Sequence, residues 1–277
     1  MCRLFGLSAG DRRVGAAFWL LDAPDSLEEQ SRRNPDGCGV AGFDAAGEVE
    51  LHKSPVAAWD DPEFGNAARR LTSSTFVAHV RHASTGGRSY ENTHPFTEGN
   101  VVFAHNGALG GLDVVDEHLG QYQRVVHGET DSERMFALIV KETAAHGGDL
   151  STGISVASGW LAEHVPVLSL NLIVVTPTDL WALRYPATNE LYLLDRNPGG
   201  EHGDQHLHGV GQHGGIRVRS SDLRDQSAIV VASERIDENP AWQPVAPGEL
   251  VHVNDQLDIE RQVIIDHPPR YLLTLPG

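Results

Sequence analysis

The order of its hydrophobic segments most constrains the fold of this 277-residue chain. Short β-rich runs come first, strongly helical segments fill the middle, and further β-rich runs continue toward the C-terminus. Strands and helices grouped in this way, without regular βαβ alternation, are typical of α+β folds with antiparallel sheets. We find no repeat and no Ser/Pro-rich linker that would divide the chain, so we expect a single domain over residues 1–277.

Local signals place the expected elements. The clearest helix spans residues 130–146, because Thr130 and Glu133 have capping-box spacing and two glycines follow the apolar stripe. The other helices are expected over residues 27–33, 62–71, 113–119 and 154–164. The strands are expected over residues 4–9, 40–43, 49–53, 75–82, 101–105, 170–176, 180–184, 191–194, 216–219, 228–232, 250–253 and 257–265.

A cysteine stands at position 2, directly before the first expected strand. If an aminopeptidase removes Met1, Cys2 carries a free α-amine beside its thiol. Such an amine has a pKa of ~7.7–8.0, so part of it is uncharged near neutral pH and can accept the thiol proton. The following strand would anchor Cys2 against the usual fraying of a terminus. Taken alone, Cys2 would be better explained as an incidental terminal residue.

Composition narrows the classes of function. The net charge of −17 argues against binding to nucleic acid or to an anionic membrane. The two cysteines, Cys2 and Cys38, form neither a disulfide framework nor a CxxC motif, which favours a reducing, cytoplasmic compartment. No apolar run approaches the length of a membrane helix. We expect no cofactor and no metal, and we interpret Cys38 as a buried small residue.

Three further segments carry polar groups that would suit a cysteine nucleophile. Arg81 ends an expected strand before Ser84 and Thr85, and a guanidinium binds a carboxylate through two parallel hydrogen bonds. Asn106 and Gly107 follow the next strand and could donate to an oxyanion. Each segment has a simpler interpretation when taken alone: Arg81 as a surface arginine, and Asn-Gly as a hairpin turn.

Asp131 opens the clearest helix, where an acidic residue also suits the helix dipole. The capping box explains its neighbours, and Asp131 could instead pair with a substrate ammonium. Together the chain offers a thiol with a base, an arginine for a carboxylate, an aspartate for an ammonium and donors for an oxyanion. Those groups meet the requirements for cleaving the side-chain amide of glutamine or another γ-glutamyl amide.

The ordered set of motifs resembles the class II (N-terminal-nucleophile, Ntn) glutamine amidotransferases, and in particular their stand-alone branch. The motifs are Met1-Cys2, Asn34-Pro35-Asp36-Gly37, His79-Val80-Arg81 with Ala83-Ser84-Thr85-Gly86, His105-Asn106-Gly107, Thr130-Asp131-Ser132-Glu133, Ala232-Ser233-Glu234 and the segment from Trp242 to Gly248. The resemblance implies a four-layer αββα sandwich, with the nucleophile at the end of a central strand. His82 stands where a tryptophan often follows the arginine in this family.

The resemblance also implies a role for each matching residue. Cys2 would be the nucleophile, and Asn106 and Gly107 the oxyanion donors. Arg81 would bind the α-carboxylate of the substrate and Asp131 its α-ammonium group. The neighbouring Ser84 and Thr85 would help to line the glutamine pocket. The implied reaction proceeds through a γ-glutamyl thioester, which water hydrolyses to glutamate.

Several functions stay open at this point. The chain could be a glutaminase subunit that works with a separate synthetase. It could instead be a self-sufficient γ-glutamyl hydrolase, resembling those of ergothioneine synthesis or glutathione breakdown. More distant alternatives are a non-catalytic glutamine-binding protein and a metal site in a His-rich loop, formed by His202, His206, His208 and His213. The spacing of these histidines matches no metal motif, which favours a solvated loop.

Overall fold

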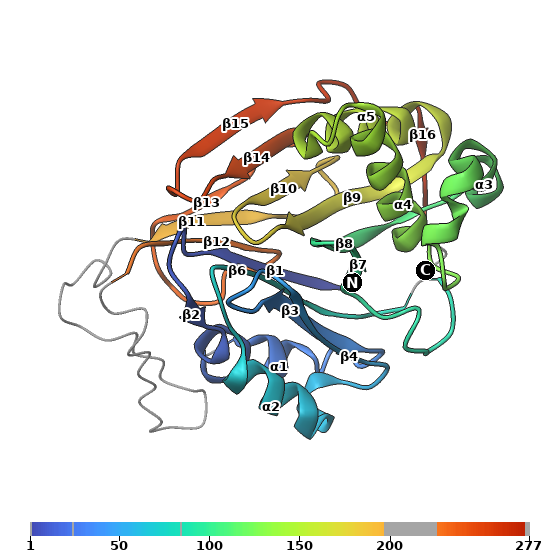
Figure 1. The fold of residues 1–277 in the computed structure, drawn as a ribbon. Coiled ribbons are helices and arrows are strands. Elements are labelled where there is room, and N and C mark those ends of the chain that lie inside the picture. Colours follow the sequence, from blue (N-terminus) through green and yellow to red (C-terminus); the bar gives the residue numbers. More distant parts are fainter. Residues whose placement is uncertain (1, 24, 84, 197–225, 275–277) are drawn as a thin grey trace.

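The computed structural model describes residues 2–23, 25–83, 85–196 and 226–274. In this part of the chain, two large β-sheets lie face to face with helices on both outer sides (Figure 1). Helices α1 (Leu27–Gln30) and α2 (Pro62–Arg70) cover the first sheet. Helices α4 (Asp131–Ala145) and α5 (Leu150–His164) cover the second. The predicted α+β sandwich with two antiparallel sheets is confirmed.

The first sheet has the strand order β13-β11-β12-β1-β6-β3-β4, and every neighbouring pair is antiparallel. Its strands are β1 (Arg3–Ser8), β3 (Cys38–Phe43), β4 (Val49–Ser54), β6 (Thr75–Val80), β11 (Tyr192–Arg196), β12 (Ala228–Ala232) and β13 (Trp242–Pro244). Strand β1 is therefore central, flanked by β12 and β6.

The second sheet has the order β15-β14-β10-β9-β8-β7, and β16 pairs in parallel with β9. Its strands are β7 (Phe96–Glu98), β8 (Val101–Leu109), β9 (Pro166–Val175), β10 (Leu180–Arg184), β14 (Glu249–Val253), β15 (Ile259–Val263) and β16 (Tyr271–Leu272). A small separate pair joins β2 (Val14–Gly15) to β5 (Thr72–Ser73). The remaining helical segments are a π-helical turn at Phe18–Asp22, short 3-10 helices at Ala58–Asp60 and Gly120–Val125, and α3 (Leu112–Leu119).

Alternation along β1 explains why the chain forms layers. Leu4 packs between the two sheets with Ile173 of β9. Phe5 and Leu7 point to the opposite face and join the core beneath the N-terminal helical segments, which includes Trp19. A third core lies between the second sheet and helices α4 and α5. Because both faces of β1 are covered, its residues read as an almost continuous apolar run.

Several expected boundaries moved for identifiable reasons. The helix expected over residues 27–33 ends at Gln30, whose carbonyl accepts a hydrogen bond from the side chain of Asn34. The last central helix begins at Leu150, four residues earlier than expected, because Asp149 caps it. Gly153 lies within this helix, where only glycine fits because a Cβ there would lie 2.1 Å from Oγ1 of Thr143. The strand expected over residues 216–219 lies outside the described residues.

No helix among the described residues combines enough length and apolar character to span a bilayer.

Candidate active site

The first sheet holds Cys2 at the start of β1. Arg3 pairs with Val80 of β6, and the thiol of Cys2 contacts the main chain of His82 just beyond that strand. The Cys2 Sγ accepts a hydrogen bond from the His82 N–H at 3.2 Å and donates to the His82 carbonyl at 3.3 Å. Burial raises the pKa of the Cys2 thiol, while the His82 N–H and the charge of Arg81 act in the opposite direction. The thiol is therefore protonated near neutral pH and needs a base.

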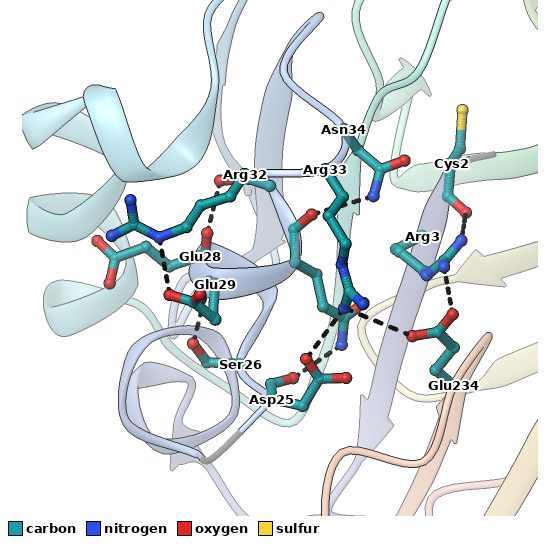
Figure 2. Close-up of polar contacts among 12 residues, drawn as sticks. Cys2, Arg3, Asp25, Ser26, Glu28, Glu29, Arg32, Arg33, Asn34 and Glu234 are labelled. Atoms are coloured by element: carbon teal, nitrogen blue, oxygen red, sulfur yellow. Dashed lines mark hydrogen bonds and ion pairs between the residues drawn. The ribbon is translucent and has the colours of Figure 1, made fainter. Parts of the chain in front are cut away.

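Arg3 and Glu234 support the main chain of Cys2. The carbonyl of Cys2 accepts a hydrogen bond from Nη1 of Arg3 at 3.1 Å, and Arg3 forms an ion pair with Glu234. Figure 2 shows the Cys2 carbonyl turned toward Arg3 and the sulfur pointing away from it. Arg33 extends the network, with its Nη2 at 4.0 Å from Glu234 and 3.3 Å from Asp25 (Figure 2). No local spacing in the sequence predicts these contacts, because Arg3 and Glu234 lie 231 positions apart.

Asn106 and Gly107 lie inside a strand, so the hairpin-turn interpretation is wrong. Strand β8 continues through both residues to Leu109, four positions beyond the expected end, and pairs Asn106 with Asn171 of β9. The Nδ2 group of Asn106 donates to Oγ of Ser233 at 3.2 Å. A Cβ on Gly107 would lie 1.9 Å from the Ser169 carbonyl oxygen, so only glycine fits.

Asp131 is the first residue of α4, where the Thr130 half of the predicted capping box is present, whereas the Glu133 carboxylate accepts from the Gly128 N–H at 2.6 Å. Oγ1 of Thr130 accepts from the Glu133 N–H at 3.2 Å. The carboxylate of Asp131 is buried and accepts a hydrogen bond from the Leu109 N–H at 2.8 Å. Its other oxygen lies 3.4 Å from Oγ1 of Thr85. Asp131 thus connects the end of β8 to the loop that follows Arg81.

The buried Arg81 guanidinium donates to three carbonyls of the loop after β6. Its Nη1 donates to Gly87 at 3.0 Å, and its Nη2 donates to Thr85 at 2.7 Å and Gly86 at 3.2 Å. The interpretation of Arg81 as a surface residue is therefore wrong. Asn92 holds the far side of this loop, because its amide donates to Gly87 and accepts from the Glu129 N–H. The loop is thus tied to the segment that precedes Asp131.

His105 is a further buried polar residue behind this site. Its Nδ1 lies 2.9 Å from Oγ of Ser132, and its Nε2 lies 2.9 Å from the Ser169 carbonyl. Burial lowers the pKa of His105, although the charge of Asp131 opposes this effect. A neutral imidazole therefore links α4 to β9 immediately beside Asn106.

The remaining predicted residues divide into two groups. Ser84 and the four histidines of the His-rich loop lie outside the described residues. Cys38 is fully buried on β3, 3.8 Å from Asp61, as expected of a small core residue. Burial, with the charge of Asp61, raises the pKa of its thiol. Across the described ranges, no group of three or more His, Cys, Asp or Glu side chains is placed to hold a metal ion.

Comparison with known proteins identifies the family of the chain. The family model for class II glutamine amidotransferases matches residues 1–267. Protein MJ1515 of Methanocaldococcus jannaschii is 34% identical over 91% of this chain and 68% of its own length. The γ-glutamyl-hercynylcysteine sulfoxide hydrolase of Mycobacterium tuberculosis is 27% identical over 92% of this chain and 94% of its own.

The fold also has a solved counterpart. The structure of a glutamine aminotransferase class-II domain protein from Silicibacter pomeroyi superposes with a TM-score of 0.61 and 21% identity, covering 94% of this chain and 98% of that one. The chain belongs to the class II glutamine amidotransferases and is an enzyme of that type.

Proposed function

We propose that the enzyme hydrolyses the γ-amide bond of glutamine or of a larger γ-glutamyl compound through Cys2. One observation carries this proposal. The thiol lies beside the first residue of a central strand and is hydrogen-bonded to the main chain of His82, the residue after Arg81. Thr85 in turn contacts both Arg81 and Asp131. Those two side chains have the charges needed to bind the carboxylate and the ammonium group of a γ-glutamyl moiety.

In the first stage, the α-amine of Cys2, freed by removal of Met1, takes the proton of the thiol. The sulfur forms a bond to the γ-carbonyl carbon, and the resulting oxyanion receives hydrogen bonds from the Asn106 amide and the Gly107 N–H. Collapse of this intermediate breaks the C–N bond. The α-ammonium group returns its proton to the departing nitrogen, so ammonia or an amine leaves and a γ-glutamyl thioester remains.

In the second stage, water attacks the thioester while the same α-amine accepts a proton from it. A second oxyanion forms and uses the same donors. Its collapse breaks the C–S bond, releases glutamate and restores the thiol. Each stage needs the amine uncharged at its start, because the amine acts as the base both times.

To bind a substrate carboxylate, Arg81 needs N–H groups that do not already donate to its own loop. Three of its N–H groups donate to the carbonyls of Thr85, Gly86 and Gly87. A substrate carboxylate would use the other N–H groups or displace these carbonyls. Asp131 would meet the α-ammonium group, with Thr85 between the two charged residues.

Two activities fit this chemistry. As a glutaminase subunit, the enzyme would hydrolyse glutamine and supply ammonia to a separate synthetase. As a self-sufficient hydrolase, it would release an organic amine from a bulkier γ-glutamyl compound. The second activity is favoured by the M. tuberculosis relative, which is named as a hydrolase of a γ-glutamyl compound and matches this chain over nearly the full length of both proteins.

The test measures glutamate release from glutamine and from a panel of γ-glutamyl amines and peptides, using the purified enzyme and its Cys2→Ala variant. Fast, Cys2-dependent hydrolysis of one bulky compound, with glutamine a poor substrate, would support the self-sufficient hydrolase. Slow hydrolysis of glutamine alone would support the glutaminase subunit. Equal glutamate release by both proteins would contradict the proposal.

A further inference from the structure

Ser233 joins strand β1 to the end of β12. Its N–H donates to the Leu4 carbonyl at 3.0 Å, and its Oγ accepts from the Leu4 N–H at 3.0 Å. The side chain is buried, with 5% of its surface exposed. This reciprocal contact continues the β1–β12 ladder, in which Phe5 pairs with Ala232. Ser233 is thus held against Leu4, which lies two residues along the chain from Cys2.

The same hydroxyl contacts the proposed oxyanion donor. Asn106 lies on β8 of the opposite sheet, and its Nδ2 donates to Oγ of Ser233 at 3.2 Å. A side-chain amide has two N–H groups, and this bond uses one of them. The bond therefore fixes the plane of the amide and the direction of its second N–H. One hydroxyl consequently ties the strand of the nucleophile to the donor on the other sheet.

Loss of this contact has a physical consequence for the reaction. Oxyanion stabilisation depends on donors that are already oriented before charge develops. Without Ser233 Oγ, the Asn106 side chain would lose its anchor and could turn about its terminal torsion. The Leu4 N–H, two residues from the nucleophile, would lose its acceptor as well.

We propose that Ser233 is a positioning residue, which holds the Asn106 amide in register with Cys2 so that its second N–H meets the oxyanion. This inference rests on the proposed function, because it assigns Ser233 to the same reaction. Ser233 does not touch the reacting atoms, so its removal should lower kcat while changing KM little. Its effect should also disappear when Asn106 is absent.

The test is a double-mutant cycle on γ-glutamyl hydrolysis with Ser233→Ala, Asn106→Ala and the combined variant. We expect Asn106→Ala to lower kcat by ~10²–10³-fold and Ser233→Ala by roughly tenfold. In the Asn106→Ala background, Ser233→Ala should cause no further loss, because residues that act through one another are non-additive. Ser233→Thr, which keeps the hydroxyl, should retain most of the activity.

Ser73→Ala is the matched control. Ser73 on β5 is also buried, and its Oγ accepts from the main-chain N–H of Phe43 on β3 at 2.8 Å. This variant loses an equivalent bond without involving Asn106, so its kcat should match wild type. Thermal unfolding of each variant reports on the fold. If Ser233→Ala does not fold, Ser233→Cys replaces it, because a thiol of similar size is a weak acceptor.

The outcomes separate the inference from the proposed function. If wild type is active and Ser233→Ala has the same kcat, the inference about Ser233 is wrong but the proposed function still holds. Losses that multiply in the combined variant would lead to the same conclusion. If wild type itself shows no Cys2-dependent release of glutamate, the proposed function fails, and the inference fails with it.

Discussion

The Cys2 thiol forms two hydrogen bonds with the main chain of His82: its sulfur accepts from the His82 N–H at 3.2 Å and donates to the His82 carbonyl at 3.3 Å. The His82 carbonyl accepts a hydrogen bond from the S–H group, so the contact stabilises the protonated thiol and orients the sulfur. Burial raises the pKa of this thiol, which has the same effect on its charge. In the resting site the thiol is therefore neutral and lies beside its proposed base, the α-amine of Cys2.

This arrangement predicts the pH profile. The proposed base has a reference pKa of ~7.7–8.0 and must be uncharged, so kcat/KM should rise with pH through this range. Burial raises the pKa of the Cys2 thiol, which disfavours a thiolate at lower pH and therefore disfavours an acid plateau. The measurement is kcat/KM from pH 5 to 9. A profile that is already flat at pH 6 would show that a pre-formed thiolate attacks.

Asp131→Asn should weaken substrate binding. The substitution keeps an acceptor for the Leu109 N–H but removes the charge proposed to bind the substrate ammonium. Charge-assisted hydrogen bonds contribute about 1.5–3 kcal/mol, so kcat/KM for glutamine should fall by roughly 10–100-fold. Glutaramate, which lacks the α-amine, provides the control: wild type and variant should hydrolyse it equally. An equal loss on both compounds would remove Asp131 from this role.

Sequence reasoning succeeded where the determining interactions are local. The cap at Thr130 joins residues three positions apart, and the short apolar run of β1 is visible in the chain itself. The extension of β8 through Asn106 was missed, because Asn-Gly favours turns locally and only pairing with β9 overrides that preference.

The supporting contacts of the site could not be predicted in the same way. Arg3 meets Glu234 across 231 positions, and Asn106 meets Ser233 across 127. No spacing rule connects such pairs. The pairing of β1 with β12 brings Arg3 to Glu234, and the stacking of the two sheets brings Asn106 to Ser233. The hydrogen bonds from Arg81 to the carbonyls of its own loop likewise depend on the backbone path of residues 85–87, which no local pattern predicts.

Gly107→Ala should destabilise the fold as well as the site. The new Cβ would lie 1.9 Å from the Ser169 carbonyl oxygen and 2.5 Å from Nε2 of His105. Overpacking typically costs about 1–3 kcal/mol, and the strand must also shift. Urea unfolding measures this free energy. Gly159→Ala in α5 is the control, because a Cβ there meets nothing within 4 Å and alanine favours a helix. Equal stability of the two variants would contradict the structure at Gly107.

Glu234→Gln should reduce turnover by loosening the main chain of Cys2. Glu234 holds Arg3, which in turn donates to the Cys2 carbonyl. Small displacements of a reacting group are costly, so we expect kcat to fall roughly threefold to tenfold. Glu29→Gln is the control, because Glu29 pairs with Arg32 where both side chains are 55% exposed, and such pairs contribute little. A kcat equal to that of the control would mean that the Arg3–Glu234 pair is purely structural.

The central claim is that Cys2, freed of Met1, is the nucleophile. Its most direct test is intact-mass analysis and peptide mapping of the protein before and after reaction with 6-diazo-5-oxo-L-norleucine, an electrophilic glutamine analogue. The account predicts a chain lacking Met1 that gains one adduct on Cys2, with loss of glutamate release in step with labelling. Active protein that retains Met1, or an adduct on the buried Cys38, would contradict it.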